Sequence, residues 1–211
     1  YYGFSQRGGS LNINTTSGQN GGTAGYGPPS GEEGNWITPL SINKESELYA
    51  GYSSVYNFSS GNWTKVSDTF EANIEVLELD PINSDIMYVS FGSKLHKSLD
   101  HGVTFSLIQD FTSNITSIEV NNNDNSIVYF TTSGGSGKVY RSTDQGINFT
   151  EITGTLPNVT KNIIKHQPFS PTNALYLGTS LGVFRYDDLT NDWGLYETNL
   201  PNTDVRDLSI N

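Results

Sequence analysis

Two octapeptides that share one pattern lie 44 residues apart in this chain, and they constrain its fold more than any other feature. Both read Ser-x-Asp-x-Gly-x-(polar)-Phe. A short aspartate side chain can accept N–H bonds from the residues after it, and a glycine two positions later can adopt positive φ. The pattern therefore predicts a sharp turn, with the phenylalanine pinning the returning strand to a core. The residues assigned to these structural turns are Ser98, Asp100, Gly102, Phe105, Ser142, Asp144, Gly146 and Phe149.

Further segments fall into register with these turns and reveal a longer repeat. Four predicted strands share a tyrosine at the same place, and they cover residues 48–51, 87–89, 128–130 and 175–178. An apolar alternation closed by a turn precedes each of them, which is typical of a strand. The returning strands begin with Trp63, Phe105, Phe149 and Trp193, at spacings of 42, 44 and 44 residues. Four-stranded antiparallel units of about 40–47 residues predict an all-β fold, a partial β-propeller.

The two ends of the chain depart from this repeat. Residues 37–211 fit about four blades, and residues 205–211 repeat the first-strand pattern of a further blade. Residues 1–36 are rich in glycine and fit either an irregular segment over the mouth of the propeller or the remnant of a preceding blade. The chain therefore reads as a piece of a larger protein. Four open blades would leave exposed edges, so we expect the isolated piece to aggregate.

Composition excludes several classes of partner. Eleven basic and 22 acidic residues give a formal net charge of −11, which argues against nucleic acid or an anionic membrane as partner. The chain has no cysteine, so it has neither a disulfide nor a thiolate ligand. No segment approaches the ~18 apolar residues of a membrane span, and we expect no membrane insertion.

The octapeptides resemble the Asp-box, or bacterial neuraminidase repeat, and the likeness extends over roughly residues 36–211. Residues 80–88, followed by the turn at Asp100, are similar to a run found in sortilin-like and xyloglucanase-like propellers. Residues 36–52 and 199–208 resemble repeats of secreted Bacteroidetes proteins in particular. This resemblance implies export, often through the type IX secretion system, and it places the Asp-boxes at the periphery, away from the ligand-binding face. The motif is specific for a fold and only weakly indicates a function.

Candidate catalytic and metal-binding residues are few. A sialidase clamps a carboxylate with clustered arginines, and this chain has too few of them. A glycoside hydrolase needs two carboxylates across a cleft, whereas Asp80 fits a turn and Asp187 and Asp188 fit a solvated hairpin tip. His96, His101 and His166 show no ligand spacing. The sequence therefore predicts no catalytic residue, metal or cofactor.

Aromatic side chains outside the repeat are better candidates for ligand-binding residues. Three of them lie in loops or outside the repeat positions that anchor the returning strands: Tyr26, Trp36 and Tyr52. Exposed rings there could stack on a ligand. Alternatively, they pack the N-terminal segment onto the propeller. We expect a non-catalytic extracellular or cell-surface module that binds a glycan or protein through the loops between blades. Alternatives are a part of a secreted xyloglucanase-like hydrolase whose catalytic residues lie elsewhere, and a cargo of the type IX secretion machinery.

Overall fold

The structure is a computed structural model that describes residues 2–14, 23–196 and 202–210. Its strands form five antiparallel sheets, one of three strands and four of four strands. The first sheet contains β1 (Tyr2–Phe4), β2 (Leu11–Asn14) and β3 (Thr23–Tyr26). The second contains β4 (Leu40–Ile42), β5 (Leu48–Gly51), β6 (Val55–Ser59) and β7 (Asn62–Lys65). The third contains β8 (Val76–Leu79), β9 (Met87–Phe91), β10 (Lys94–Ser98) and β11 (Ser106–Asp110). The fourth contains β12 (Ile115–Val120), β13 (Val128–Thr132), β14 (Val139–Ser142) and β15 (Thr150–Glu151). The fifth contains β16 (Lys161–His166), β17 (Leu175–Thr179), β18 (Gly182–Asp187) and β19 (Asp192–Leu195).

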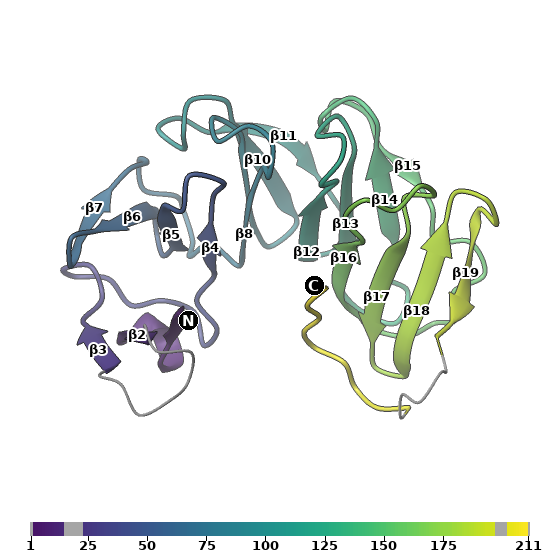
Figure 1. Ribbon diagram of the computed structural model, residues 1–211, viewed down its shortest axis with the longest axis horizontal. Coiled ribbons are helices and arrows are strands. Elements are labelled where there is room, and N and C mark those ends of the chain that lie inside the picture. Colours follow the sequence, from purple (N-terminus) through teal and green to yellow (C-terminus); the bar gives the residue numbers. More distant parts are fainter. Residues whose placement is uncertain (1, 15–22, 197–201, 211) are drawn as a thin grey trace.

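Each four-stranded sheet is a meander in which consecutive strands are hydrogen-bonded neighbours. The sheets follow one another around an open arc, with β4, β8, β12 and β16 on its inner side (Figure 1). A crossover leads from the outermost strand of one sheet to the innermost strand of the next. Residues 27–39 and 66–75 are the first two such crossovers. The predicted four-stranded antiparallel units are confirmed.

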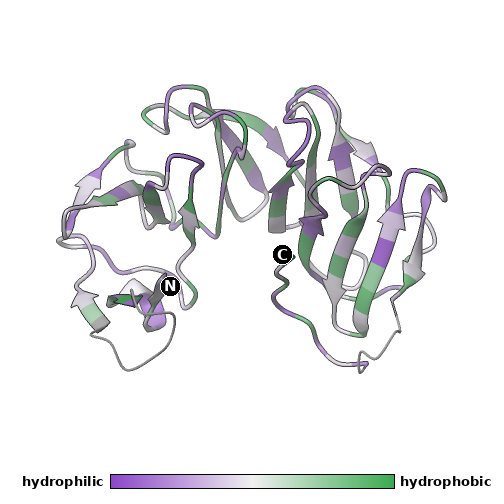
Figure 2. Ribbon diagram, viewed as in Figure 1, coloured by the Kyte–Doolittle hydropathy of each residue, from purple (hydrophilic) through white to green (hydrophobic). Residues whose placement is uncertain are grey.

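The hydrophobic core lies between successive sheets, because each sheet buries one face against the next. One cluster joins Tyr49 to Leu77 and Met87 of the following sheet. The equivalent Tyr88 packs with Val128 and lies wholly inside the protein. Hydrophobic side chains are accordingly concentrated on the strands, and several connecting turns are hydrophilic (Figure 2).

The shared tyrosine is buried in three of the four repeats and half-buried in the last. Tyr88 donates its hydroxyl to the backbone oxygen of Gln145 in the next sheet, 3.2 Å away. Tyr176, at the same place in β17, instead packs edge-on against Tyr196. Its partial exposure follows from its position in the last sheet of the arc, which has no following sheet among the described residues.

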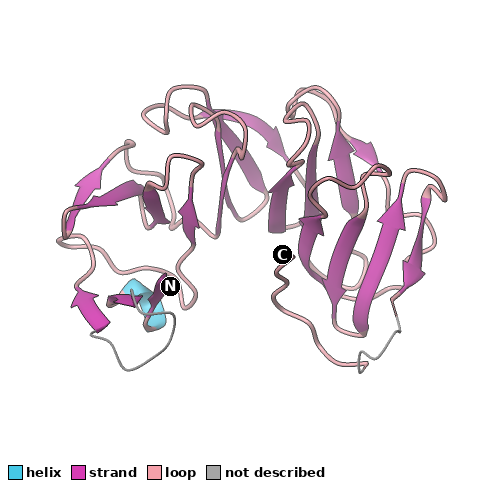
Figure 3. Ribbon diagram, viewed as in Figure 1, coloured by secondary structure: helices cyan, strands magenta, loops and turns pink. Residues whose placement is uncertain are grey.

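The glycine-rich N-terminal segment is more regular than its composition suggests. It forms β1–β3 and a short 3₁₀ turn at Gln6–Gly8, visible as the cyan element in Figure 3. The Phe4 ring stacks on Trp63 at 5.9 Å, and the Tyr52 hydroxyl donates to the backbone oxygen of Gly8 at 2.8 Å. These contacts fasten the first sheet to the second, so the segment packs beside a blade.

The expected first strand of a further blade is not formed as a regular strand. Within residues 202–210, the backbone N–H of Val205 donates to Thr179 O at 2.9 Å, and the Asn162 amide donates to Val205 O at the same distance. The segment therefore runs along the last sheet without pairing in a ladder. Among the described residues, no helix is long and apolar enough to cross a membrane.

Candidate functional site

The two octapeptide turns have the geometry predicted from their residues. The backbone N–H of Gly102 donates to Ser98 Oγ at 2.9 Å, and that of Thr104 donates to Asp100 Oδ1 at 2.9 Å. Gly102 has φ +81°, and a Cβ there would lie 2.8 Å from Met87 Sδ, so the position requires glycine. The polar side chains of the turn are thus committed to local hydrogen bonds, which makes the turn structural.

The second octapeptide repeats this arrangement. Gly146 N–H donates to Ser142 Oγ at 2.8 Å, and Asn148 N–H donates to Asp144 Oδ1 at 2.9 Å. The two phenylalanines pin the returning strands, since Phe105 lies 5.4 Å from Phe70 and Phe149 lies 5.0 Å from Phe130, centroid to centroid.

The turn in the last sheet corrects one sequence-based interpretation. Asp187 is buried rather than solvated, and its Oδ1 accepts N–H bonds from Leu189 and Thr190 at 3.1 and 3.0 Å. Asp188 pairs with Arg141 of the preceding sheet at 2.9 Å. An aspartate therefore caps this turn without the octapeptide, because the capping bonds need only a carboxylate at a suitable spacing.

The three aromatic candidates for ligand stacking differ in how deeply they are buried. Tyr52 was wrongly assigned as a ligand-stacking ring, because it is fully buried and packs edge-on against Tyr56 at 5.8 Å. Tyr26 is half-buried and its ring lies 4.9 Å from Phe58. Trp36 is 63% exposed, and its neighbour Ile37 is 79% exposed. Only Trp36 of the three presents most of its ring to a ligand.

Trp36 belongs to a polar hollow of about 360 Å³ that we call the crossover site. It is lined by Arg7, Glu33, Gly34, Asn35, Trp36 and Asn73. The Asn35 amide donates to Ile74 O at 3.1 Å, and the Asn73 amide donates to Glu33 O at 2.9 Å. The two crossovers that flank the second sheet are therefore tied to each other by reciprocal bonds, which orient both amide side chains.

The N-terminal turn completes this site. Arg7 has φ 58° and ψ 27°, a left-handed conformation that is uncommon for a residue other than glycine. Its N–H donates to Trp36 O at 3.3 Å, its backbone oxygen accepts from Gly34 N–H at 3.0 Å, and its guanidinium pairs with Glu33. A Cβ at Gly34 would lie 2.1 Å from Thr38 Oγ1, so the close approach depends on glycine. Backbone strain held by surrounding contacts is a feature of ligand sites.

Charged groups on the inner strands form a second cluster. Lys165 on β16 donates to Glu119 Oε2 on β12 at 2.7 Å, and His166 N–H donates to Glu119 Oε1 at 3.0 Å. On β8, Glu78 Oε1 lies 3.5 Å from the Val120 N–H. Burial and the neighbouring Glu119 raise the pKa of Glu78 to about 8, and burial also raises the pKa of Glu119. Both glutamate side chains thus join one sheet to the next.

The sequence did not indicate most residues of the crossover site. Arg7, Glu33 and Asn35 lie in the glycine-rich segment, and Asn73 lies in a different crossover, so no spacing links them. Within the residues that the structure describes, no group of three histidine, aspartate or glutamate side chains could hold a metal ion.

Solved structures similar to this chain are large β-propeller enzymes. The GH74 enzyme of Niastella koreensis matches with a TM-score of 0.62 and 19% identity, over 77% of this chain and 29% of its own. The GH74 xyloglucanase of Xanthomonas campestris matches with a TM-score of 0.60 and 14% identity, and the match covers 76% of this chain and 30% of the xyloglucanase. An ancestral GH74 enzyme matches with a TM-score of 0.61 and 18% identity, and the match covers 75% of this chain and 23% of that enzyme. No protein-family model and no curated protein sequence matches the chain.

Proposed function

We propose that this chain is a carbohydrate-binding, non-catalytic part of an exported or cell-surface propeller, and that the crossover site binds the sugar. The chain has the fold of part of a β-propeller of the xyloglucanase type and spans at most 30% of the length of the matched structures. The observation that carries this proposal is the exposed Trp36 indole beside the Arg7–Glu33 pair and two oriented amides. The X. campestris neighbour is a xyloglucanase, which supports a glycan as the ligand class to test first.

The chemistry of the crossover site suits a pyranose ring. The apolar C–H face of a sugar can stack on an exposed indole, and the rim of hydroxyls can bond to carboxylate, guanidinium and amide groups. Arg7 and Glu33 are 60% and 68% exposed, so both can exchange solvent for a ligand. The Asn35 and Asn73 amides are already held by backbone oxygens, which lowers the entropy lost on binding.

The test replaces Trp36 and measures binding of xyloglucan and cello-oligosaccharides by calorimetry. We expect Trp36→Ala to weaken binding about tenfold or more, since a lost stacking contact corresponds to roughly 1.4 kcal/mol. Ile37→Ala is the matched control, because it removes an exposed but non-aromatic side chain of the same loop. Equal affinity of the parent protein and Trp36→Ala would refute the assignment of this site.

A hydrolase remains the second candidate, and the similarity to GH74 enzymes favours it. If the protein is a hydrolase, its catalytic carboxylates lie outside this chain, because Glu78 and Glu119 form contacts between sheets. Release of reducing sugar from xyloglucan by the full-length protein would establish this candidate and refute a purely binding role. Passage through the type IX secretion system and binding of a protein through the loops between blades stay predictions of the sequence.

A further inference from the structure

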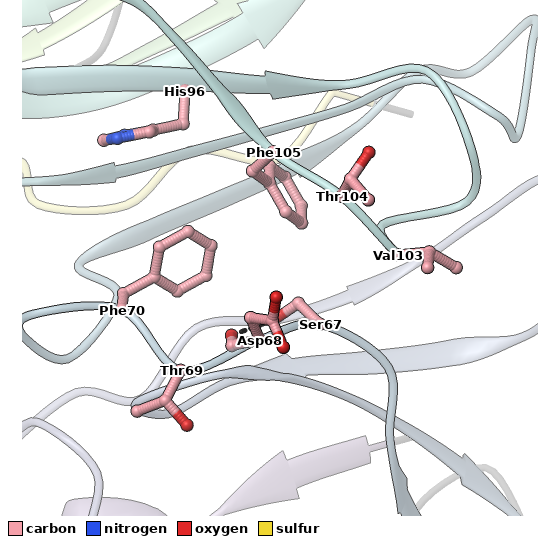
Figure 4. A pocket seen from close by; sticks show the side chains of 8 residues that line it. All are labelled: Ser67, Asp68, Thr69, Phe70, His96, Val103, Thr104 and Phe105. Carbon is pink, nitrogen blue, oxygen red and sulfur yellow. Dashed lines mark hydrogen bonds between the residues drawn. The ribbon is translucent and has the colours of Figure 1, made fainter.

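A second pocket, which we call the inter-blade pocket, lies between the second and third sheets and is separate from the crossover site. It has a volume of about 270 Å³ and is shown in Figure 4. One wall is the crossover segment Ser67, Asp68, Thr69 and Phe70. The other wall is His96 of β10 with Val103, Thr104 and Phe105 of the following turn.

Aromatic rings meet at steep angles in this pocket. The Phe70 centroid lies 5.4 Å from that of Phe105 at 69°, and 5.9 Å from that of His96 at 62°. All three side chains are half-buried, so each keeps surface that faces solvent. In Figure 4 the Phe70 and Phe105 rings lie beside each other. Their edge-to-face contact gives the pocket an angled aromatic wall, which we call the cage, and not the flat platform on which a sugar stacks.

The polar groups that are free in this cage act as hydrogen-bond acceptors. The Asp68 carboxylate is exposed and makes no hydrogen bond or ion pair with any residue that the structure describes. His96 Nδ1 is buried and also lacks a partner among those residues. Burial lowers the pKa of His96, so its ring is neutral at neutral pH and does not repel a cation. The hydroxyls of Ser67, Thr69 and Thr104 are already bonded within the protein.

Two lysines lie near the pocket: Lys94 is paired with Glu71, and Lys65 donates to the Thr69 hydroxyl at 2.7 Å. Asp68 is the charged side chain among the residues that line the pocket, and the chain as a whole carries a net charge of −11. A negative field of this kind raises the rate at which basic partners associate.

We propose that the inter-blade pocket binds an arginine side chain of a partner protein. A guanidinium group is planar, stacks on aromatic faces, offers five donors and no acceptor, and pairs with carboxylates through two bonds. The cage supplies two of the matching features, the phenylalanine rings and one exposed, free carboxylate. This proposal is independent of the crossover site and of the sugar ligand proposed there.

The experiment uses two peptides that differ in charge alone. Acetyl-Gly-Arg-Gly-amide is titrated into the protein, and acetyl-Gly-citrulline-Gly-amide serves as the isosteric neutral control. Binding is followed by calorimetry and by the NMR signals of the His96 ring. We expect the arginine peptide to bind about tenfold more tightly or better, because the cation–π and ion-pair contributions are lost with the charge.

Single substitutions test whether the arginine peptide binds in the inter-blade pocket. We expect Asp68→Asn to lower affinity for the arginine peptide severalfold without unfolding the protein, since the side chain is exposed and unpartnered. Phe70→Leu should have a similar effect, with its folding checked by thermal denaturation. Trp36→Ala should leave arginine binding unchanged, which separates this proposal from that of the crossover site. Equal binding of the citrulline peptide or full affinity in Asp68→Asn would overturn the proposal.

Discussion

Single aspartates set the turns of this protein by accepting several bonds at once. Asp100 accepts from the Thr104 hydroxyl at 2.6 Å, from the Thr104 N–H and from the Ser98 hydroxyl at 2.7 Å. The bonds from Thr104 and Ser98 lower the pKa of Asp100 to about 2, and the bonds from Asn148 and Ser142 do the same for Asp144. Because the pKa is lowered in the folded state, the stabilisation is complete above the unfolded pKa near 3.8 and is lost as the pH falls through about 2.

The double variant Asp100→Asn/Asp144→Asn tests this effect. We expect it to melt at a lower temperature than the parent protein at pH 7, and to lose less in melting temperature between pH 5 and pH 2. The measurement is thermal denaturation followed by circular dichroism across that pH range. Asp68→Asn is the control, since its carboxylate makes no hydrogen bond within the described residues. Melting curves that shift in parallel for the parent and the double variant would contradict the prediction.

At the level of strands, neighbouring sheets are joined by side chains on the inner strands. Ser117 of β12 accepts from the Ile164 N–H of β16 at 3.2 Å, and Thr116 donates to Lys161 O at 2.7 Å. The ion pair between Glu119 and Lys165 lies on the same two strands, with a Glu119 side chain that is only 6% exposed. A carboxylate this deeply buried depends on its partner, because an uncompensated buried charge is strongly destabilising.

Lys165→Met should therefore destabilise the protein by about 3–5 kcal/mol at pH 7. The matched control is Lys138→Met, which breaks a pair with Glu151 in which both side chains are 45% exposed. A surface pair of this kind contributes about 0–1 kcal/mol. Urea unfolding of the two variants measures both values. Equal losses in the two variants would show that burial of Glu119 does not govern the energy of its pair.

At the level of the whole molecule, the arc is open, and within the described residues one face of its last sheet is covered by no further sheet but only in part by residues 202–210. Tyr176 and Tyr196 meet there at 5.5 Å, and Arg185 bonds within its own sheet to Asp187. In the third and fourth sheets, the side chains equivalent to Arg185 reach forward instead, Lys97 to Gln145 O and Arg141 to Asp188. The described part of the chain therefore lacks the sheet that would cover this face.

We expect the polypeptide of residues 1–211 on its own to associate through this face, as the open edges in the sequence suggested. Sedimentation velocity between low and high micromolar concentration should show a rising mean mass. Tyr196→Lys should shift the distribution towards the monomer by placing a charge on the open face. Ile147→Lys is the control, because Ile147 is 77% exposed on a turn of another sheet. A monomer at every concentration would contradict this expectation.

Short-range chemistry explains why so much of the fold could be predicted. The aspartate turns, the alternation of the strands and the spacing of Phe105 and Phe149 depend on residues a few positions apart, and all four meanders form as expected. For residues 1–36 the sequence left open an irregular segment or the remnant of a preceding blade, because none of the repeat motifs marks the N-terminal strands. They are fixed by packing on another sheet, as the contact between Phe4 and Trp63 shows.

The blade unit and its turns follow from local sequence, since each repeat contains the residues that its own hydrogen bonds and core need. Which side chains meet to form sites depends on how the sheets pack against one another. Arg7 and Asn73 share the crossover site, and Asp68 faces Phe105 in the inter-blade pocket, because consecutive sheets place their crossovers and turns side by side. The exposure of Trp36 and the burial of Tyr52 were decided in the same way. Both are aromatic residues near a predicted strand, and only the packing of the first sheet on the second separates them.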